Sequence, residues 1–278
     1  MHINRIYESL ELLPIWIINL DTATNRLNAI TKNLHENKLS FQRIPAVNIK
    51  NFKVTTEKAR YDDTLNQKIY FTALTSGEKG CFMSHQLAWR ELLRSQHPFG
   101  LILEDDVELD PKATKNLLKA LTWLDTEEPR YLKLYAKRPQ GGKVVEAPDG
   151  SLNIKVPELP PLGTQAQALN RAAAELLIAK SLTFGNPVDV FLQTWWIHKV
   201  QIGVLQPNAF HEISASLGGS TIQSSLSGSL TKKLVRSFVR LIFRTKLFLL
   251  AVYFTRRSQL LSFLQRSHRH SDESQYPK

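Results

Sequence analysis

The chain has 278 residues, of which 42% are hydrophobic and 22% are charged, a balance that is ordinary for a globular protein with a large core. Its single cysteine excludes an internal disulfide and favours a reducing compartment. No run reaches the roughly 18 apolar residues of a membrane-spanning helix, and the N-terminus lacks the layout of a signal peptide.

Positive charge is concentrated at one end of the chain. The net charge is +11. Residues 231–278 hold 11 basic and 2 acidic residues, whereas residues 1–230 hold 25 basic and 23 acidic residues. The body is therefore nearly neutral and the tail strongly basic, which predicts an anionic partner for the tail.

The first hundred residues read as the start of an α/β fold. Residues 14–20 are apolar and β-branched and predict a strand, after which Asp21 and Thr22 offer a helix cap. We expect a second strand at 41–47, an irregular loop over the active face at 48–75, and a helix begun by the capping box Thr75–Glu78.

The most informative segment is an apolar run, residues 99–103, that ends at Glu104, Asp105 and Asp106. The run predicts a buried strand. Three carboxylates cannot stay unpaired in a core, so we expect them at the carboxyl end of the strand, where α/β sheets bind ligands. Oxygen ligands favour Mg²⁺ or Mn²⁺. A solvated acidic turn is the alternative.

The second half of the body is less regular. We expect a helix from Asp110 and Pro111 to about residue 124, a short strand at 131–135, and loops and hairpins over 138–161. An alanine-rich helix at about 165–180 and short apolar segments at 188–192 and 204–205 follow, and residues 214–229 read as a flexible Ser/Gly linker.

The tail predicts a basic amphipathic helix over residues 230–265. Five apolar residues recur at helical spacing between Lys and Arg residues: Leu234, Phe238, Leu241, Ile242 and Phe248. Such a helix is typical of a membrane interface. Packing against the body is the alternative, and nucleic acid is not expected because the body shows no matching basic face.

Several motifs, taken in order, resemble glycosyltransferase family 25, which includes bacterial galactosyltransferases of lipooligosaccharide synthesis. They are INLDTATNRL (18–27), GEKGCFMSHQLAW (77–89), LILEDDVEL (101–109), GT (163–164) and PVDVFLQ (187–193). The resemblance covers about residues 14–212. It departs at Gln165-Ala166-Gln167, where the family usually has small residues and then an aromatic.

The resemblance implies a GT-A-like, Rossmann-related sheet flanked by helices, a UDP-sugar donor, Mn²⁺ or Mg²⁺, and inverting transfer to a sugar hydroxyl. Asp106 is the expected direct metal ligand, with Glu104 and a late histidine, His211, as further candidates. The residues expected to bind the donor are Asn19, Arg26, Ser84, His85, Glu104, Asp105, Gly163 and Thr164.

Asp189 is the candidate base on the acceptor hydroxyl, because a lone Asp within PVDVF is hard to explain as a solvated residue. An N-cap is the alternative for Asp189. For His85 the alternative is a satisfied core histidine, and for Arg26 an exposed helical arginine.

The sequence thus predicts a metal-dependent glycosyltransferase that moves a sugar, galactose by resemblance, from a UDP-sugar to a lipid-linked lipooligosaccharide or lipopolysaccharide acceptor. We expect three parts, a transferase domain (1–213), the linker (214–229) and a tail (230–278) on an anionic membrane. The expected location is the cytoplasmic face of a bacterial inner membrane. Another nucleotide-sugar transferase or a nucleotidyltransferase on the same fold, and an inactive membrane-bound homologue, remain alternatives.

Overall fold

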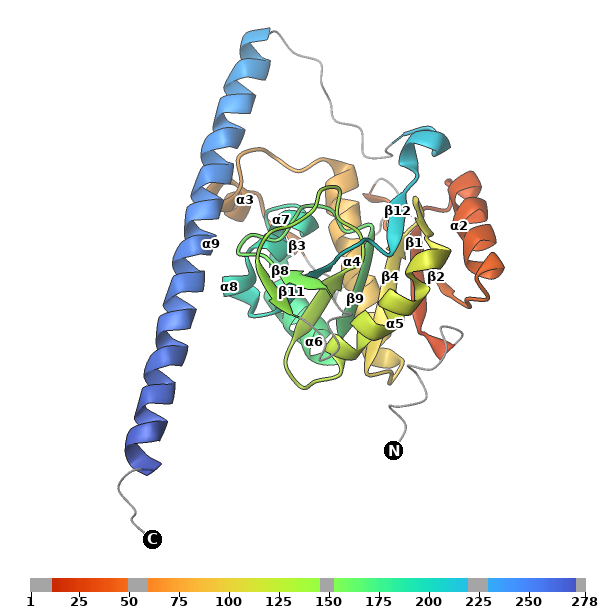
Figure 1. The fold of residues 1–278 in the computed structure, drawn as a ribbon. Helices are drawn as coiled ribbons and strands as arrows, with labels where there is room; N and C mark the ends of the chain where they lie inside the picture. Colours follow the sequence, from red (N-terminus) through yellow and green to blue (C-terminus); the bar gives the residue numbers. More distant parts are fainter. Residues whose placement is uncertain (1–11, 50–59, 146–152, 220–229, 274–278) are drawn as a thin grey trace. The chain divides into compact units, whose positions relative to one another are not determined.

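The computed structural model describes residues 12–49, 60–145, 153–219 and 230–273, and the chain divides into two compact units, residues 1–227 and 228–278. The first unit is built on a mixed eight-stranded sheet (Figure 1). Across the sheet the strands follow in the order β2 (Gln42–Pro45), β1 (Ile15–Asn19), β4 (Phe99–Glu104), β9 (Ala166–Asn170), β6 (Arg130–Lys133), β11 (Gln201–Leu205), β8 (Ile154–Val156) and β7 (Lys143–Val145).

Strand direction brings the ends of several strands to one edge of the sheet. Strands β2, β1 and β4 are parallel, and β9 lies between β4 and β6 and runs antiparallel to both. The carboxyl ends of β1, β4 and β6 therefore meet the amino end of β9, where Leu103 pairs with Ala166. In α/β folds this carboxyl edge is the usual place for a ligand.

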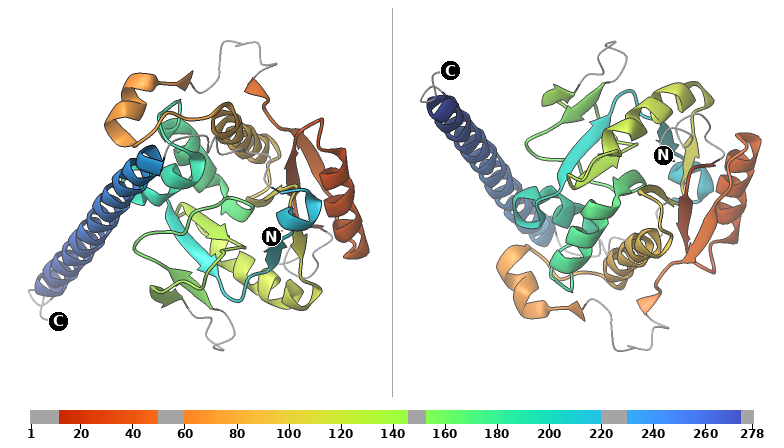
Figure 2. Two further views of the ribbon diagram at one scale, coloured as in Figure 1. Left: turned by 90° about the horizontal axis from the view of Figure 1, so that it is seen from above. Right: turned by 90° about the horizontal axis from the view of Figure 1, so that it is seen from below.

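Helices cover both faces of the sheet, because the strands carry apolar side chains on both sides. One core joins strand residues to α2 (Thr24–Glu36) and α5 (Thr114–Leu121). The other joins them to α4 (Ser76–Arg94), α6 (Arg171–Lys180) and α7 (Val188–Gln193). Figure 2 shows α2 and α4 on opposite sides of β1. This is an α/β fold with a mixed central sheet flanked by helices.

Two small sheets and several short elements complete the described part of this unit. β3 (Arg60–Tyr61) pairs with β10 (Thr183–Phe184), and β5 (Val107–Leu109) pairs antiparallel with β12 (Phe210–Glu212). The short helical elements are α3 (Asp63–Ile69), α8 (Trp195–His198), η3 (Pro111–Ala113), η4 (Thr122–Leu124) and η5 (Ser214–Leu217).

The strong local signals of the sequence are confirmed. The apolar segments 14–20 and 41–47 contain β1 and β2, and 99–103 forms all of β4 but its last residue, Glu104. The capping box at Thr75 is present, with the Glu78 side chain accepting from the Thr75 amide. Asp110 caps η3 with Pro111 at its first position. The acidic triplet lies where the chain leaves β4, as its composition predicted.

The helix expected at 165–180 is wrong in its first third. Residues 166–170 form β9, a fully buried strand, and the helix begins only at Arg171, where the Asn170 side chain accepts from the Ala173 amide. Alanine and glutamine favour a helix locally, but hydrogen bonding to β4 and β6 on either side overrides that preference.

Two smaller expectations also need correction. The segment 48–75 is not all loop, because it contains β3 and α3, with the Asp62 side chain capping α3; its residues 50–59 lie outside the described part. Helix α2 is capped by neither Asp21 nor Thr22, since its N-cap is Ala23, without a side-chain cap.

The second unit is a single helix over its described residues, α9 (Leu230–Glu273), whose side chains are described for 234–261. The expected linker falls partly on residues 220–229, outside the described residues. Among the described residues, no helix has the length and apolar character needed to cross a membrane.

Candidate functional site at the carboxyl edge of the sheet

The acidic triplet is held by an arginine from α2. The guanidinium of Arg26 donates from Nη1 to Asp105 Oδ1 and from Nη2 to Asp106 Oδ2, both at 2.7 Å. All three side chains are nearly buried, and Asn19 at the end of β1 donates to Asp105 Oδ2 at 2.7 Å. Four predicted site residues thus meet at this edge.

The two aspartates differ in their remaining capacity to bind a ligand. Both Asp105 oxygens accept hydrogen bonds, whereas Asp106 Oδ1 is buried with no partner among the described residues. Burial, reinforced by the charge of Glu104, raises the pKa of Asp106 to about 6, although Arg26 opposes the shift. Asp106 therefore keeps one unsatisfied oxygen, which a ligand could bind.

Glu104 lies at the centre of a second network. Its Oε1 accepts from Thr164 Oγ1 at 2.6 Å and lies 3.2 Å from His85 Nε2. Burial alone would raise the pKa of Glu104, but hydrogen bonds from His85 and Thr164, with the charge of Arg26, outweigh burial and lower that pKa. Glu104 is accordingly a carboxylate in the folded protein.

His85 is fully buried on α4, and its partners determine which ring nitrogen carries the proton. The Gln167 amide nitrogen lies 3.0 Å from His85 Nδ1 and also donates to the Thr164 carbonyl. Nδ1 therefore accepts, and Nε2 carries the proton that it donates to Glu104. This arrangement accounts for His85 as a satisfied buried histidine that orients Glu104.

Cys81 lies one helical turn before His85, and the ligand atoms of Cys81, His85 and Glu104 all lie within 4.8 Å of one another. Burial raises the pKa of the Cys81 thiol well above its usual value. With the thiol protonated and the Nε2 proton of His85 donated to Glu104, a transition metal here would have to displace both protons before Cys81 and His85 could act as ligands.

Asp189 joins the same edge from the first turn of α7. Its Oδ2 accepts from the Gly163 amide at 3.2 Å, and its Oδ1 accepts from the Val190 amide. Gly163 has a φ of +90°, and a Cβ there would lie 2.4 Å from the Gln165 side-chain oxygen. The motifs GT (163–164) and PVDVFLQ (187–193) are thus in contact, although 26 residues separate Asp189 from Gly163.

Sequence reasoning missed Lys133 and Gln167 in this edge. Lys133 ends β6 with only 1% of its surface exposed, and its Nζ donates to the Gly163 carbonyl. Burial lowers the pKa of Lys133 to about 8, against the opposing charges of Asp189 and Glu104. The signal was a charged residue inside the apolar strand 131–135, where a lysine is rarely buried without a partner.

Ser84 and His211 are placed elsewhere. Ser84 is buried in α4, where its hydroxyl accepts from the Val47 amide at 2.8 Å and donates to the Gly80 carbonyl at 2.7 Å. Those contacts tie α4 to the chain after β2, so Ser84 has a structural role that its motif did not indicate.

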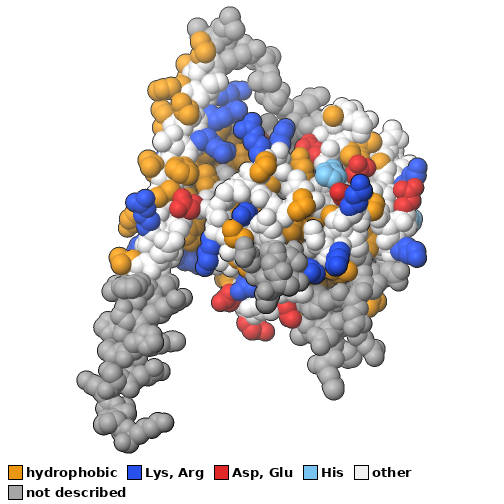
Figure 3. Space-filling model, in the orientation of Figure 1, with side chains coloured by type: hydrophobic (Ala, Val, Ile, Leu, Met, Phe, Trp, Pro, Cys, Tyr) orange, Lys and Arg blue, Asp and Glu red, His pale blue; other side chains and the backbone are white. Residues whose placement is uncertain are grey.

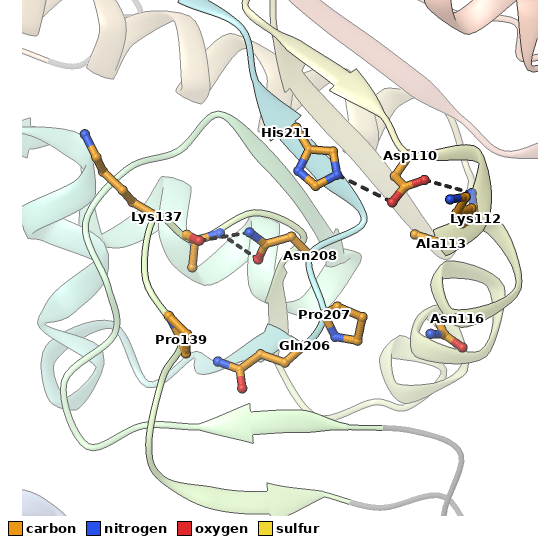
Figure 4. A pocket seen from close by; sticks show the side chains of 11 residues that line it. Asp110, Lys112, Ala113, Asn116, Lys137, Pro139, Gln206, Pro207, Asn208 and His211 are labelled. Carbon is orange, nitrogen blue, oxygen red and sulfur yellow. Dashed lines mark hydrogen bonds and ion pairs between the residues drawn. The ribbon is translucent and has the colours of Figure 1, made fainter.

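Among the described residues, the side chain of His211 makes its polar contact with Asp110 and none with the acidic triplet. Because β12 pairs with β5, the His211 ring lies beside Asp110, with 3.5 Å between Nε2 and Oδ2. Figure 4 shows this pair in a pocket of about 450 Å³ that Lys112, Lys137 and Asn208 also line. We therefore leave His211 out of the metal ligands.

Comparison with known proteins connects this edge to a family. Procollagen galactosyltransferase 2 of Mus musculus is 26% identical over 189 residues, which cover 64% of this chain but 29% of the mouse protein. The lipooligosaccharide biosynthesis protein lic2B of Haemophilus influenzae is 30% identical over 110 residues, 40% of this chain and 39% of that protein. The chain thus spans well under half the length of both relatives.

A solved glycosyltransferase involved in the glycosylation of the major capsid of PBCV-1 is similar at a TM-score of 0.32 and 8% identity, over 59% of this chain and 63% of that one; this likeness is too weak to argue from. The family model described as glycosyltransferase family 25 (LPS biosynthesis protein) matches residues 12–140. That range contains Asn19, Arg26, His85 and the whole acidic triplet. Residues 12–140 of this chain thus match glycosyltransferase family 25, and together with the relatives they support a glycosyltransferase.

Proposed function

We propose that this chain is an inverting, GT-A-like glycosyltransferase that moves galactose from UDP-galactose to a hydroxyl of a lipooligosaccharide or lipopolysaccharide. The observation that carries the proposal is the buried cluster at the carboxyl edge. There Arg26 binds Asp105 and Asp106 beside an ionised Glu104, inside a family 25 domain. The names of the mouse and Haemophilus relatives support the sugar and the acceptor respectively.

The residues present fit a hard divalent cation, Mn²⁺ or Mg²⁺. Asp106 Oδ1 is a buried oxygen with no partner among the described residues, and Glu104 is a nearby carboxylate with one oxygen outside the His85 and Thr164 hydrogen bonds. Asp105 is less available as a ligand because Asn19 and Arg26 each donate a hydrogen bond to one of its oxygens. When bound, such a cation would neutralise negative charge on the departing diphosphate.

Arg26 and Asp105 have a supporting role in this proposal. Their ion pair is held at both ends, by Asn19 on one side and Asp106 on the other. It fixes the orientation of Asp106 before a ligand arrives, so little reorganisation is needed on binding. We infer that Arg26 acts through Asp106 rather than by binding the donor directly.

Asp189 is the proposed base that removes the proton from the acceptor hydroxyl. Its two oxygens accept backbone amides from Gly163 and Val190, which fix the carboxylate in place, and the side chain is partly exposed. A fixed carboxylate near the donor can deprotonate an incoming hydroxyl as the new bond forms.

The tail is proposed to hold the enzyme at an anionic membrane, where a lipid-linked acceptor lies. Apolar and basic side chains both line the described part of α9 (Figure 3). The cytoplasmic face of a bacterial inner membrane is the location that this pairing favours.

A UDP-release assay tests the transfer reaction. The chain is incubated with UDP-galactose, UDP-glucose or UDP-N-acetylglucosamine, with de-acylated lipooligosaccharide, and with either Mn²⁺ or excess chelator. We expect UDP release with UDP-galactose and Mn²⁺, and a fall of about 10²-fold or more in Asp106→Asn. Asp110→Asn is the matched control, since Asp110 lies outside the cluster.

Each alternative gives a different result in that assay. Release of pyrophosphate in place of UDP would indicate a nucleotidyltransferase. UDP binding without any turnover, with or without acceptor, would indicate an inactive homologue. Full activity in excess chelator would remove the metal from the proposal.

A further inference from the structure

Lys133 is an unusual residue for the end of a buried central strand. It is 1% exposed on β6, opposite Gln167 of β9 and Val204 of β11. Burying an ammonium group is costly unless its charge and its hydrogen bonds are compensated. Lys133 Nζ donates a hydrogen bond to a neutral acceptor, the Gly163 carbonyl, and the carboxylates of Asp189 and Glu104 lie near enough to act on its charge.

Gly163 links this cation to the proposed base. Its carbonyl accepts from Lys133, and its amide donates to Asp189 Oδ2 at 3.2 Å. The next residue, Thr164, donates to Glu104 at 2.6 Å. One short turn, residues 163–164, thus contacts Lys133, Asp189 and Glu104.

The conformation of the turn needs this support. Gly163 lies at a φ of +90°, which is open to glycine but leaves the turn free to relax to other conformations. A hydrogen bond from a buried, charged donor is stronger than one from a neutral donor. The buried Lys133 therefore holds the turn through the Gly163 carbonyl.

We propose that Lys133 is a positioning residue that fixes the 163–164 turn and, through it, the orientation of Asp189 and Glu104. Its burial prevents it from reaching substrate, so it acts through other residues. This inference rests on the proposed transfer reaction for its kinetic consequence, but the coupling of Lys133 to Asp189 is a property of the folded chain alone.

Steady-state kinetics with UDP-galactose tests the positioning role. Lys133→Met keeps the length of the side chain and removes both charge and donor. We expect kcat to fall about 10²-fold, the cost of a misplacement near 1 Å, with the KM for UDP-galactose within about threefold of wild type. Lys143→Met, at an exposed lysine of β7, should leave both constants unchanged.

The second arm asks whether Lys133 acts through Asp189. In an Asp189→Asn background, adding Lys133→Met should lower kcat by less than about threefold more, because the group being positioned is already altered. A full 10²-fold further loss, or a rise in KM with kcat unchanged, would overturn the proposal.

Thermal unfolding supplies a readout that needs no substrate. Removing Lys133 takes away the positive charge near Asp189, and Asp189→Asn takes away one of the two negative charges near Lys133. The double variant should therefore lose less than the two single losses combined. Additive losses in melting temperature would contradict the coupling. If the wild type turns over no UDP-sugar, the proposed function fails and this cycle still decides the inference. If Lys133→Met does not fold, Lys133→Gln, which keeps a hydrogen-bond donor, replaces it in the kinetic and thermal experiments.

Discussion

At the scale of single residues, the carboxyl edge concentrates buried charge. Arg26, Asp105, Asp106 and Lys133 are all nearly inaccessible to solvent, and each is paired or hydrogen-bonded. Buried ion pairs contribute little net stability, but removing one partner leaves an uncompensated charge. The residues of this edge therefore depend on one another strongly, which makes single substitutions informative.

The Arg26 ion pair predicts a large loss of stability. Arg26→Met leaves Asp105 and Asp106 buried without their cation, and we expect the free energy of unfolding to fall by about 3–5 kcal/mol in urea titrations. Lys32→Met is the control on the same helix, because Lys32 is exposed and pairs weakly with Glu36 at 3.9 Å; its effect should stay within about 0.5 kcal/mol. Equal losses in the two variants would show that the Arg26 pair is unimportant.

A buried histidine outside the candidate site predicts acid sensitivity. His198 lies 3.1 Å from the Leu192 carbonyl through Nε2 and accepts from the Val200 amide, and burial lowers its pKa from 6.5 to about 4. In the unfolded chain His198 therefore binds a proton near pH 6.5, whereas in the folded chain it becomes protonated only near pH 4. Its contribution to stability is complete above pH 6.5 and is lost as the pH falls towards 4.

The pKa shift of His198 corresponds to a loss of about 3 kcal/mol in the free energy of unfolding between pH 6.5 and pH 4. Chemical unfolding at a series of pH values measures it, and His198→Gln should flatten the slope in that window. His35→Gln, at an exposed position of α2, should keep the wild-type slope. A slope unchanged by His198→Gln would assign the acid sensitivity to other groups.

At the scale of elements, the acidic triplet is positioned because β4 ends where its apolar run ends. The sequence predicted this strand, the helix capped at Thr75 and the edge that collects Glu104 and Asp106, because each rests on a local signal. Apolar runs and capping boxes act over a few residues and need no knowledge of distant partners.

Contacts between segments distant in the sequence could not be predicted from the sequence alone. β9 looks helical by composition and becomes a strand because β4 and β6 pair with it. The contact of Asp189 with Gly163 and the role of Lys133 depend on the same topology. The pairing of β12 with β5, which puts His211 beside Asp110, likewise leaves no local pattern in the sequence.

The contact between α4 and the chain after β2 depends on a glycine. A Cβ on Gly80 would lie 2.3 Å from the Val47 carbonyl oxygen, a backbone atom that cannot move freely. We expect Gly80→Ala to lower the free energy of unfolding by about 1–3 kcal/mol, as overpacking does. Gly141→Ala, where an added Cβ meets nothing within 4 Å, is the matched control. A Gly80→Ala variant as stable as Gly141→Ala would show that the segment at Val47 adjusts freely.

At the scale of the whole molecule, the chain combines a nearly neutral body with a basic helix. Exposed apolar residues recur along α9, among them Leu234, Phe238, Leu241, Ile242 and Leu249. At 3.6 residues per turn they fall along one side, and Arg236, Arg240 and Arg244 fall on the other. That division is typical of a helix that lies in a membrane interface rather than across it.

Vesicle sedimentation tests this membrane role. The full chain and a truncation after residue 229 are mixed with vesicles of neutral phosphatidylcholine alone or with phosphatidylglycerol added. We expect the full chain to bind the anionic vesicles and the truncation to stay in solution, with UDP-galactose turnover on a soluble acceptor retained. Equal partition of the two chains would contradict an anchoring role for α9.

Charge substitutions then separate electrostatic attraction from apolar insertion. Each basic residue near an anionic surface contributes about 1 kcal/mol, so replacing Arg236, Lys246 and Arg257 with Ser should weaken binding by about 10²-fold at low salt, and less as salt screens the attraction. Replacing three lysines of the body, Lys32, Lys112 and Lys155, with Ser removes the same charge and should change binding little. If both triple variants weaken binding equally, net charge alone drives adsorption and the helix has no special role. If only the tail variant weakens binding, the basic residues of α9 hold the transferase at the membrane, where a lipid-linked acceptor would be.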